Sequence, residues 1–382
     1  MKLTLRNSVL TVHRWTGLTI GFVILMLALT GALNLFRPAL EVKLDSDLLT
    51  VPACGERAPL DTVAASAAQS HGRGTLDYIR IVGAEPGAER IPSLQVRFAD
   101  PQEVVYVNPC TAQVLGERGR YGGFFGRVEQ LHILRYSEEK WVREITAVAA
   151  IAFAVVLIGG GLYMWWPRRG VSFKTALRLR PGLQGQARDL NLHKTFGVFS
   201  SAMLLLLVLT ALPLAFEWYR EGIYMLAGSP LPSKSPRSVV VKDAPRISME
   251  EFWQRVQKLT PDPAMALVKF PAKKADAPLE GFSVERGAPH VNARGLFVLD
   301  AYSGKTLSHT PYEASSLGHK LYFWTISFHT GQYGGVAVQA LMLAAVLVVP
   351  LMAYTGLSSY LARRRRQNTE GKGAASSSAA KA

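Results

Sequence analysis

The chain has 382 residues, of which 49% are apolar and only 19% are charged. This balance differs from that of ordinary soluble proteins and argues against a simple cytosolic enzyme. The formal net charge of +15 would suggest a nucleic-acid partner if the basic residues formed one surface. They instead flank long apolar segments, which removes the main support for nucleic-acid binding.

Four segments contain no Asp, Glu, Lys, Arg or His, and each is at least 22 residues long: Trp15–Phe36, Ile145–Trp166, Thr195–Phe216 and Val336–Leu361. A helix rises about 1.5 Å per residue and crosses a hydrocarbon layer of roughly 30 Å in about 20 residues. In lipid, only a helix or a closed barrel satisfies every backbone polar group. The sequence therefore predicts a membrane α-helical fold with four transmembrane helices.

Basic residues beside these segments predict the orientation of the chain. They are Lys2, Arg6 and Arg14, then Arg168, Arg169, Lys174, Arg178, Arg180 and Arg188, and finally Arg363 to Arg366. The positive-inside rule places these residues and both termini in the cytoplasm, with anionic lipid as a secondary contact. The two long connecting segments then lie in the periplasm of a bacterial inner membrane.

The predicted parts follow from the spans and their flanks. In chain order they are a cytoplasmic N-terminus (1–14), the first span (15–36), a first periplasmic domain (37–143), the second span (144–166), a basic loop (167–194), the third span (195–218), a second periplasmic domain (219–334), the fourth span (335–361) and a basic tail without regular structure (362–382). Cys54 and Cys110 both fall in the first periplasmic domain. That compartment permits a disulfide, but two separate small apolar side chains fit the sequence equally well.

The two halves of the chain repeat. At an offset of 180, His13 aligns with His193, Gly17 with Gly197, and Thr30 with Thr210. Further along, Leu131-His132 with Tyr136 matches Phe328-His329 with Tyr333. A unit of helix, outer domain, histidine segment and helix therefore occurs twice, which predicts a duplicated bundle.

Each outer segment mixes strand and helix patterns, so we expect two small α+β domains. Strands are expected at Thr75–Val82, Ser93–Phe98, Phe282–Glu285 and Leu296–Asp300, and helices at Leu60–Ala68 and Ser248–Leu259. Val105–Leu115 and Leu296–Leu307 both have the pattern of strand, turn and strand. The turn Asp300–Gly304 has hairpin chemistry, and a lone Asp with a Gly is a weak metal-ligand set.

Four histidines occupy repeated positions at the two membrane edges. His13 and His193 begin their helices at the cytoplasmic face, and His132 and His329 lie near the outer face. A porphyrin iron has two axial positions, which two neutral imidazoles on facing helices can fill. The pattern thus predicts two b-type haems, each held by one histidine pair. The other histidines, His71, His290, His309 and His319, are expected to be domain or surface residues.

The same residues also fit simpler roles, which the sequence leaves open. An interfacial histidine can be an amphipathic side chain, and zinc or copper could use the same nitrogens, although such sites usually need three or four protein ligands. Arg14 and Lys194 could neutralise haem propionates or be positive-inside flanks. Gly17 and Gly197 could admit a planar ring or serve helix packing.

The chain resembles the PepSY-associated transmembrane family. The likeness lies in His13-Arg-Trp-Thr-Gly17, in Asp189-Leu-Asn-Leu-His193, and in the strand-turn motif that ends at Ser303-Gly304-Lys305. Within the family it is similar to reductases of ferrioxamine-type siderophores. In the first periplasmic motif Ala112 replaces the usual turn glycine, which suggests a modified hairpin.

The resemblance implies PepSY-like periplasmic domains, haem b in the bundle, and reduction of a ferric siderophore. His13, His193, His132 and His329 are the positions that match. One electron releases the cargo, because Fe(III) prefers hard oxygen donors and Fe(II) binds them less tightly. The chain lacks a nucleotide fingerprint, so the electron donor would be quinol or a separate reductase. A siderophore permease and a haem-free binding scaffold are the alternatives.

Overall fold

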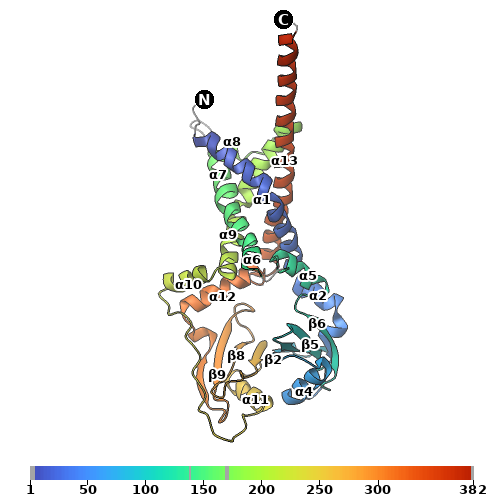
Figure 1. The fold of residues 1–382 in the computed structure, drawn as a ribbon, viewed down its shortest axis with the longest axis vertical. Helices are drawn as coiled ribbons and strands as arrows, with labels where there is room; N and C mark the ends of the chain where they lie inside the picture. The colour runs from blue at the N-terminus through green and yellow to red at the C-terminus, as the bar shows by residue number, and fades with distance from the viewer. Residues whose placement is uncertain (1–4, 137–138, 168–171, 380–382) are drawn as a thin grey trace. The chain divides into compact units, whose positions relative to one another are not determined.

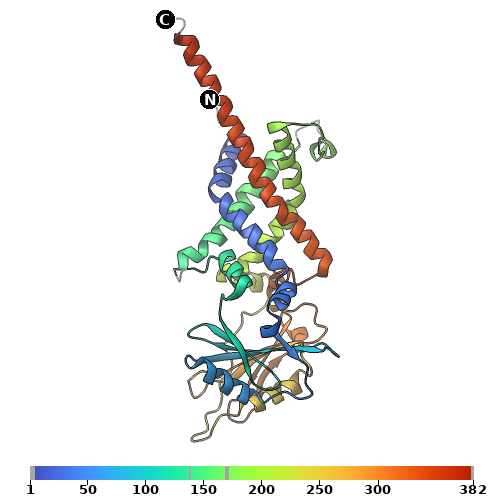
Figure 2. The same ribbon diagram turned by 90° about the vertical axis from the view of Figure 1, so that its right-hand side faces the viewer.

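A computed structural model describes residues 5–136, 139–167 and 172–379, and divides the chain into two units. The membrane unit contains residues 1–35, 130–215 and 334–382, and the sheet unit contains residues 36–129 and 216–333. Lys2, Arg168 and Arg169, which contributed to the predicted orientation, lie outside the described residues. Figures 1 and 2 show each unit in two views.

The membrane unit contains four helices that are long and apolar enough to span a bilayer, as the sequence predicts. They are α1 (Leu5–Leu35), the segment Glu144–Trp165, α9 (Gly185–Ala215) and Gly335–Asn368 of α13 (Gly335–Ala379). The second span is built from α6 (Lys140–Ala152), a π-helical segment η1 (Phe153–Gly159) and α7 (Gly160–Trp165), and the short α8 (Phe173–Ala176) follows it.

These helices extend beyond the apolar windows. The first begins at Leu5 and α9 begins at Gly185, inside the predicted basic loop, because Arg, Lys and Gln are good helix formers. The prediction that residues 362–382 lack regular structure is wrong up to Ala379, since α13 continues to that residue. Arg, Gln and Ala favour the helix in this segment, and no proline occurs after Leu361.

In the sheet unit, strands from both halves of the chain form one eight-stranded antiparallel sheet, and β1 (Thr50–Pro52) and β3 (Arg90–Pro92) form a separate two-stranded sheet. The order of the larger sheet is β10-β9-β8-β7-β2-β4-β5-β6. The strands are β2 (Leu76–Val82), β4 (Leu94–Phe98), β5 (Glu103–Val107), β6 (Val114–Gly119), β7 (Met265–Lys269), β8 (Leu279–Val284), β9 (Arg294–Leu299) and β10 (Thr306–Thr310). The two segments join where β2 pairs with β7, from Tyr78 opposite Lys269 to Val82 opposite Met265. The expectation of two independent domains is corrected accordingly.

Each half supplies one helix to the same face of this sheet. These helices, α4 (Leu60–His71) and α11 (Met249–Leu259), lie side by side (Figures 1 and 2). The carboxylate of Asp61 accepts both first N–H groups of α11, at 2.9 Å, and the carboxylate of Glu250 accepts the N–H of Leu60 at 2.8 Å. Each helix therefore satisfies the orphan donors at the start of the other.

The remaining elements connect the units and edges. They are α2 (Arg37–Leu44), α3 (Ser46–Leu49), β1 (Thr50–Pro52), β3 (Arg90–Pro92), α5 (Gly123–His132), α10 (Glu217–Leu226), η2 (Tyr312–Ala314) and α12 (Leu317–His329). A disulfide joins Cys54 to Cys110 with a Cα–Cα distance of 6.1 Å, which settles the question that the sequence left open. Ala112 of the β5–β6 turn has φ of 57°, the conformation that a turn glycine usually supplies.

Candidate functional site

Two of the repeated histidines lie next to each other in the membrane unit. His13 is eight residues into α1 and His193 is eight residues into α9. Their ring centroids are 6.3 Å apart and their planes are inclined by 76°. The pairing expected from the repeat at this end of the bundle is thus present in the structure, with both side chains half-buried.

The π-helical segment of the second span orients His13. The N–H of Gly160 bonds the carbonyls of Val155 and Leu157, so the carbonyl of Val156 is without its usual donor four residues later. Nδ1 of His13 lies 3.2 Å from this carbonyl oxygen. Because a carbonyl only accepts, Nδ1 carries the proton and the lone pair of the ring is on Nε2.

A threonine of the fourth span orients His193 in the same way. The hydroxyl of Thr355 donates to the carbonyl of Leu351 at 2.7 Å, and it lies 2.9 Å from Nδ1 of His193. Its single proton is already used, so the hydroxyl accepts from Nδ1–H. Because Nδ1 carries the proton, the lone pair of His193 is also on Nε2. Thr355 itself is fully buried.

Glycines of the partner helices contact the two rings. A Cβ at Gly161 would lie 3.5 Å from Cε1 of His13, and a Cβ at Gly356 would lie 3.5 Å from Cε1 of His193. The glycines singled out from the sequence behave differently. A Cβ at Gly17 would meet Leu157, and one at Gly197 would meet Met352. Their helix-packing interpretation therefore fits the structure, whereas Gly161 and Gly356 shape the histidine site.

A buried carboxylate holds α9 against α13 one turn before His193. Asp189 is 2% exposed, and its Oδ2 accepts from the hydroxyl of Ser358 at 2.6 Å while Oδ1 accepts from Arg188 at 3.0 Å. Ser358 is three residues after Thr355, so the same two helix faces meet at Asp189 and at His193. The sequence motif contained Asp189, but only the structure reveals its role in positioning.

His132 has a similar environment at the other end of the membrane unit. The hydroxyl of Thr30 donates to the carbonyl of Met26 at 2.6 Å and lies 2.8 Å from Nδ1 of His132, so it accepts from that nitrogen. A Cβ at Gly31 would lie 3.3 Å from Cε1 of this ring. Three of the four predicted histidines thus share one tautomer, and each contacts a glycine.

The other predicted site residues are His329, Arg14 and Lys194. His329 ends α12 in the sheet unit, so its pairing with His132 stays a prediction from the repeat. Arg14 is half-buried and Lys194 is exposed, and each follows its histidine directly. Both the propionate interpretation and the positive-inside interpretation of these two residues fit that placement.

The histidines without repeat partners belong to the sheet unit, and three of them are buried. Nε2 of His290 lies 3.0 Å from the Tyr312 hydroxyl, and Nδ1 lies 2.9 Å from that of Ser327. Nε2 of His319 lies 2.9 Å from the carbonyl of Arg294. Burial lowers the pKa of His290 and of His319, so both are neutral at pH 7.

The sequence did not predict the polar contacts of His290, His319 and His71, because their hydrogen-bond partners belong to helices and strands distant in the chain. His71 ends α4 between two glutamates, whereas His309 is half-buried on β10.

Comparison with known protein families identifies the family of the chain. The family model described as the PepSY-associated TM region matches residues 10–363. The chain belongs to this family. A search of curated proteins gives no match. The PepSY-associated TM match covers nearly the whole chain, including the apolar cores of all four spans and the four repeated histidines, so the protein is a membrane protein of this family.

Proposed function

We propose that this protein is an inner-membrane di-haem b reductase that passes electrons across the bilayer and reduces a ferric siderophore in the periplasm. The observation that carries the proposal is the pair His13 and His193 with both rings held through Nδ1. The PepSY-associated TM family is consistent with a role in iron uptake. The substrate is an oxygen-donor ferric complex of the ferrioxamine type.

The spacing of the two rings fits a metal ion between them. His13 and His193 would hold an iron between them through Nε2, the nitrogen that is not used in the contacts with Val156 and Thr355. The ring centroids of His13 and His193 are 6.3 Å apart, which leaves room for one metal ion between the rings. Hydrogen bonds from Nδ1 to Val156 and Thr355 are the outer-shell contacts that fix a ligating imidazole.

Haem b in such a site supplies one-electron chemistry through its iron. The residues of this chain fix the ligand nitrogens, and the spans exclude water from them. A second site is proposed at His132 and His329, at the opposite end of a duplicated bundle. His13 and Thr30 are 17 residues apart in α1, which corresponds to about 26 Å along the helix axis. The two sites would therefore lie near opposite faces of the membrane.

The orientation of the chain is part of the proposal. The disulfide Cys54–Cys110 supports an oxidising compartment for the sheet unit, which is the periplasm of a bacterium. The arginines Arg363 to Arg366 support a cytoplasmic C-terminus. Arg14 and Lys194, beside the inner histidines, would then neutralise propionates at the cytoplasmic face. The electron donor is quinol or a separate reductase.

Haem content and its redox response test the proposal. Protein purified from haem-replete cells should contain two haems per chain by pyridine haemochromogen absorbance. His13→Ala and His193→Ala should each lose one haem, and His132→Ala and His329→Ala should each lose the other. His309→Ala is the matched control and should keep both.

The reduced protein should be reoxidised by ferrioxamine B. It should not be reoxidised by the gallium(III) complex of the same chelator, because gallium(III) does not accept the electron. Two outcomes would contradict the proposal. Siderophore flux through haem-free protein in vesicles would favour a permease, and the absence of both haem and flux would favour a binding scaffold.

A further inference from the structure

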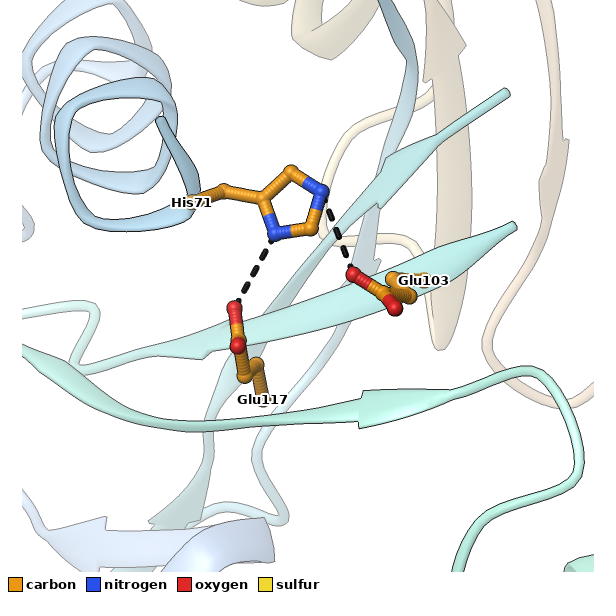
Figure 3. A group of neighbouring side chains, drawn as sticks. All are labelled: His71, Glu103 and Glu117. Carbon is orange, nitrogen blue, oxygen red and sulfur yellow. Dashed lines mark hydrogen bonds and ion pairs between the residues drawn. The ribbon is translucent and has the colours of Figure 1, made fainter. Parts of the chain in front are cut away.

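A histidine of the sheet unit lies between two carboxylates that have no role in the proposed reductase (Figure 3). His71 is the last residue of α4, Glu103 begins β5, and Glu117 is on β6. In the register of these strands Glu103 is opposite Gly119 and Glu117 is opposite Val105. The two glutamates therefore project from the same face of the sheet, one diagonal step apart.

The two nitrogens of His71 have different partners. Nδ1 lies 3.0 Å from Oε2 of Glu117 and forms a hydrogen bond, so Nδ1 carries a proton. Nε2 lies 3.2 Å from Oε2 of Glu103 but makes no hydrogen bond, although it is buried. The His71 side chain is 2% exposed, and its ring lies against Phe98 with centroids 4.3 Å apart. Nε2 thus lies beside a carboxylate oxygen without a hydrogen bond, and the imidazole itself is buried.

Local charge makes this arrangement unfavourable unless a cation is present. Arg118 and Arg120 pair elsewhere, with Asp45 and Glu129. In the part of the chain that the structure describes, the ion pairs of Glu103 and Glu117 involve His71 alone. The C-terminal end of α4 adds further negative potential at His71. Repulsion between like charges on one sheet face is relieved when a cation lies between them.

We propose that His71 and Glu103 bind a divalent first-row transition-metal cation, with Glu117 holding the imidazole. Nitrogen and carboxylate ligands suit Zn²⁺, Fe²⁺ and Mn²⁺. Two ligand atoms 3.2 Å apart, each about 2.1 Å from one ion, subtend roughly 100° at that ion, which is compatible with tetrahedral or octahedral coordination. In many metal sites a carboxylate accepts a hydrogen bond from the second nitrogen of a metal-bound histidine. Glu117 has the position of this carboxylate, because it accepts from Nδ1 of His71.

The site can exchange ions with solvent. The side chain of Glu103 is 24% exposed and that of Glu117 is 53% exposed, while the imidazole between them is buried. Because His71 and Glu103 are only two protein ligands, water molecules would complete the coordination on the exposed side, and the site would be more open than the usual zinc site of three or four protein ligands. The inference does not depend on haem, because none of these three residues is a proposed haem ligand.

Zinc binding to the full-length protein in detergent tests the inference. The protein carries a tag without histidine, is stripped with a chelator, and is dialysed against micromolar Zn²⁺ before atomic emission analysis. Both cysteines are in the disulfide, so no thiolate competes for zinc. We expect one Zn²⁺ per chain that Glu103→Gln removes, with at least a 100-fold loss of affinity. Glu117→Gln should weaken binding 10- to 100-fold.

Matched controls separate binding from folding. Glu89→Gln changes an exposed carboxylate of the same unit and should keep wild-type zinc affinity. Zinc should raise the unfolding temperature of the wild type and of Glu89→Gln, but not that of Glu103→Gln. Because the Glu117 side chain is half exposed, Glu117→Gln provides a second variant if Glu103→Gln does not fold. Lack of zinc uptake by the wild type, or uptake that Glu103→Gln and Glu117→Gln leave unchanged, would overturn the proposal.

Discussion

The hydroxyl of Thr355 offers a sharp test of the inner histidine site. Thr355→Val preserves the shape of the side chain but removes the acceptor that lies 2.9 Å from Nδ1 of His193. The residue is fully buried, so water cannot replace the lost oxygen. The carbonyl of Leu351 loses only a supplementary donor, because helical carbonyls keep their backbone partners. The main consequence of Thr355→Val is therefore that Nδ1–H of His193 is buried without an acceptor.

The expected magnitude follows from the role of such contacts. Loss of an outer-shell partner of a ligating histidine typically weakens metal affinity 10- to 100-fold, or about 1.4–2.7 kcal/mol. The burial of Thr355 favours the upper part of this range, since an unsatisfied buried donor costs about 1–3 kcal/mol. If the proposed haem site is correct, one haem should leave Thr355→Val some 10- to 100-fold faster than it leaves the wild type.

Haem transfer to excess apomyoglobin, followed at the Soret band, measures this rate. Thr355→Ser keeps the hydroxyl and should restore slow release. Thr30→Val removes the corresponding contact of His132 and should accelerate release of the other haem only. The reasoning fails if Thr355→Val releases haem at the wild-type rate while His193→Ala loses it. Equal acceleration of both haems would instead indicate general unfolding of the bundle.

Three further predictions concern the sheet unit. Reduction of the Cys54–Cys110 disulfide, which closes a loop of 56 residues, should lower the free energy of unfolding by about 4 kcal/mol at most, measured in urea with and without reductant. Asp61→Ala removes the acceptor of the first two N–H groups of α11 but leaves the N-cap Ser248, and should cost about 1–2 kcal/mol in the same assay, whereas a change below about 0.3 kcal/mol would contradict this role of Asp61. Burial raises the pKa of Asp300, but hydrogen bonds from Ser303 and Val239 outweigh it and lower the pKa to about 2. Stability from this group is present above about pH 4 and should fall by about 2 kcal/mol toward pH 2, a fall that Asp300→Asn should flatten in pH-dependent thermal unfolding.

The sequence predicted those parts of the fold that depend on local patterns. Apolar windows located the spans, and residue periodicity located α4 and α11, although the structure begins α11 at Met249 with Ser248 as its N-cap. The turn at Asp300 was also predicted, and the Asp300 carboxylate accepts the N–H of Ser303 while Gly304 has φ of 66°. Each of these features is determined by residues within one contiguous segment of the chain.

Features that depend on distant partners could not be predicted. The pairing of β2 with β7 joins segments almost 190 residues apart, and nothing in either strand pattern specifies its partner. The contact of Thr355 with His193 and that of Val156 with His13 likewise depend on helix packing. The repeat indicated which histidines belong together. It did not indicate the hydroxyl of Thr355 or the carbonyl of Val156, which determine the tautomers, or the glycines beside the rings.

The junction between β2 and β7 also means that neither half of the sheet unit is complete alone. Separation of the halves would expose on each a full-length strand with unpaired N–H and C=O groups, from Tyr78 to Val82 on one side and from Met265 to Lys269 on the other. Such open edges promote aggregation between chains. A truncated form ending after the second span is therefore expected to be insoluble, and co-expression of the missing fragment should rescue it by supplying the strand that closes the edge.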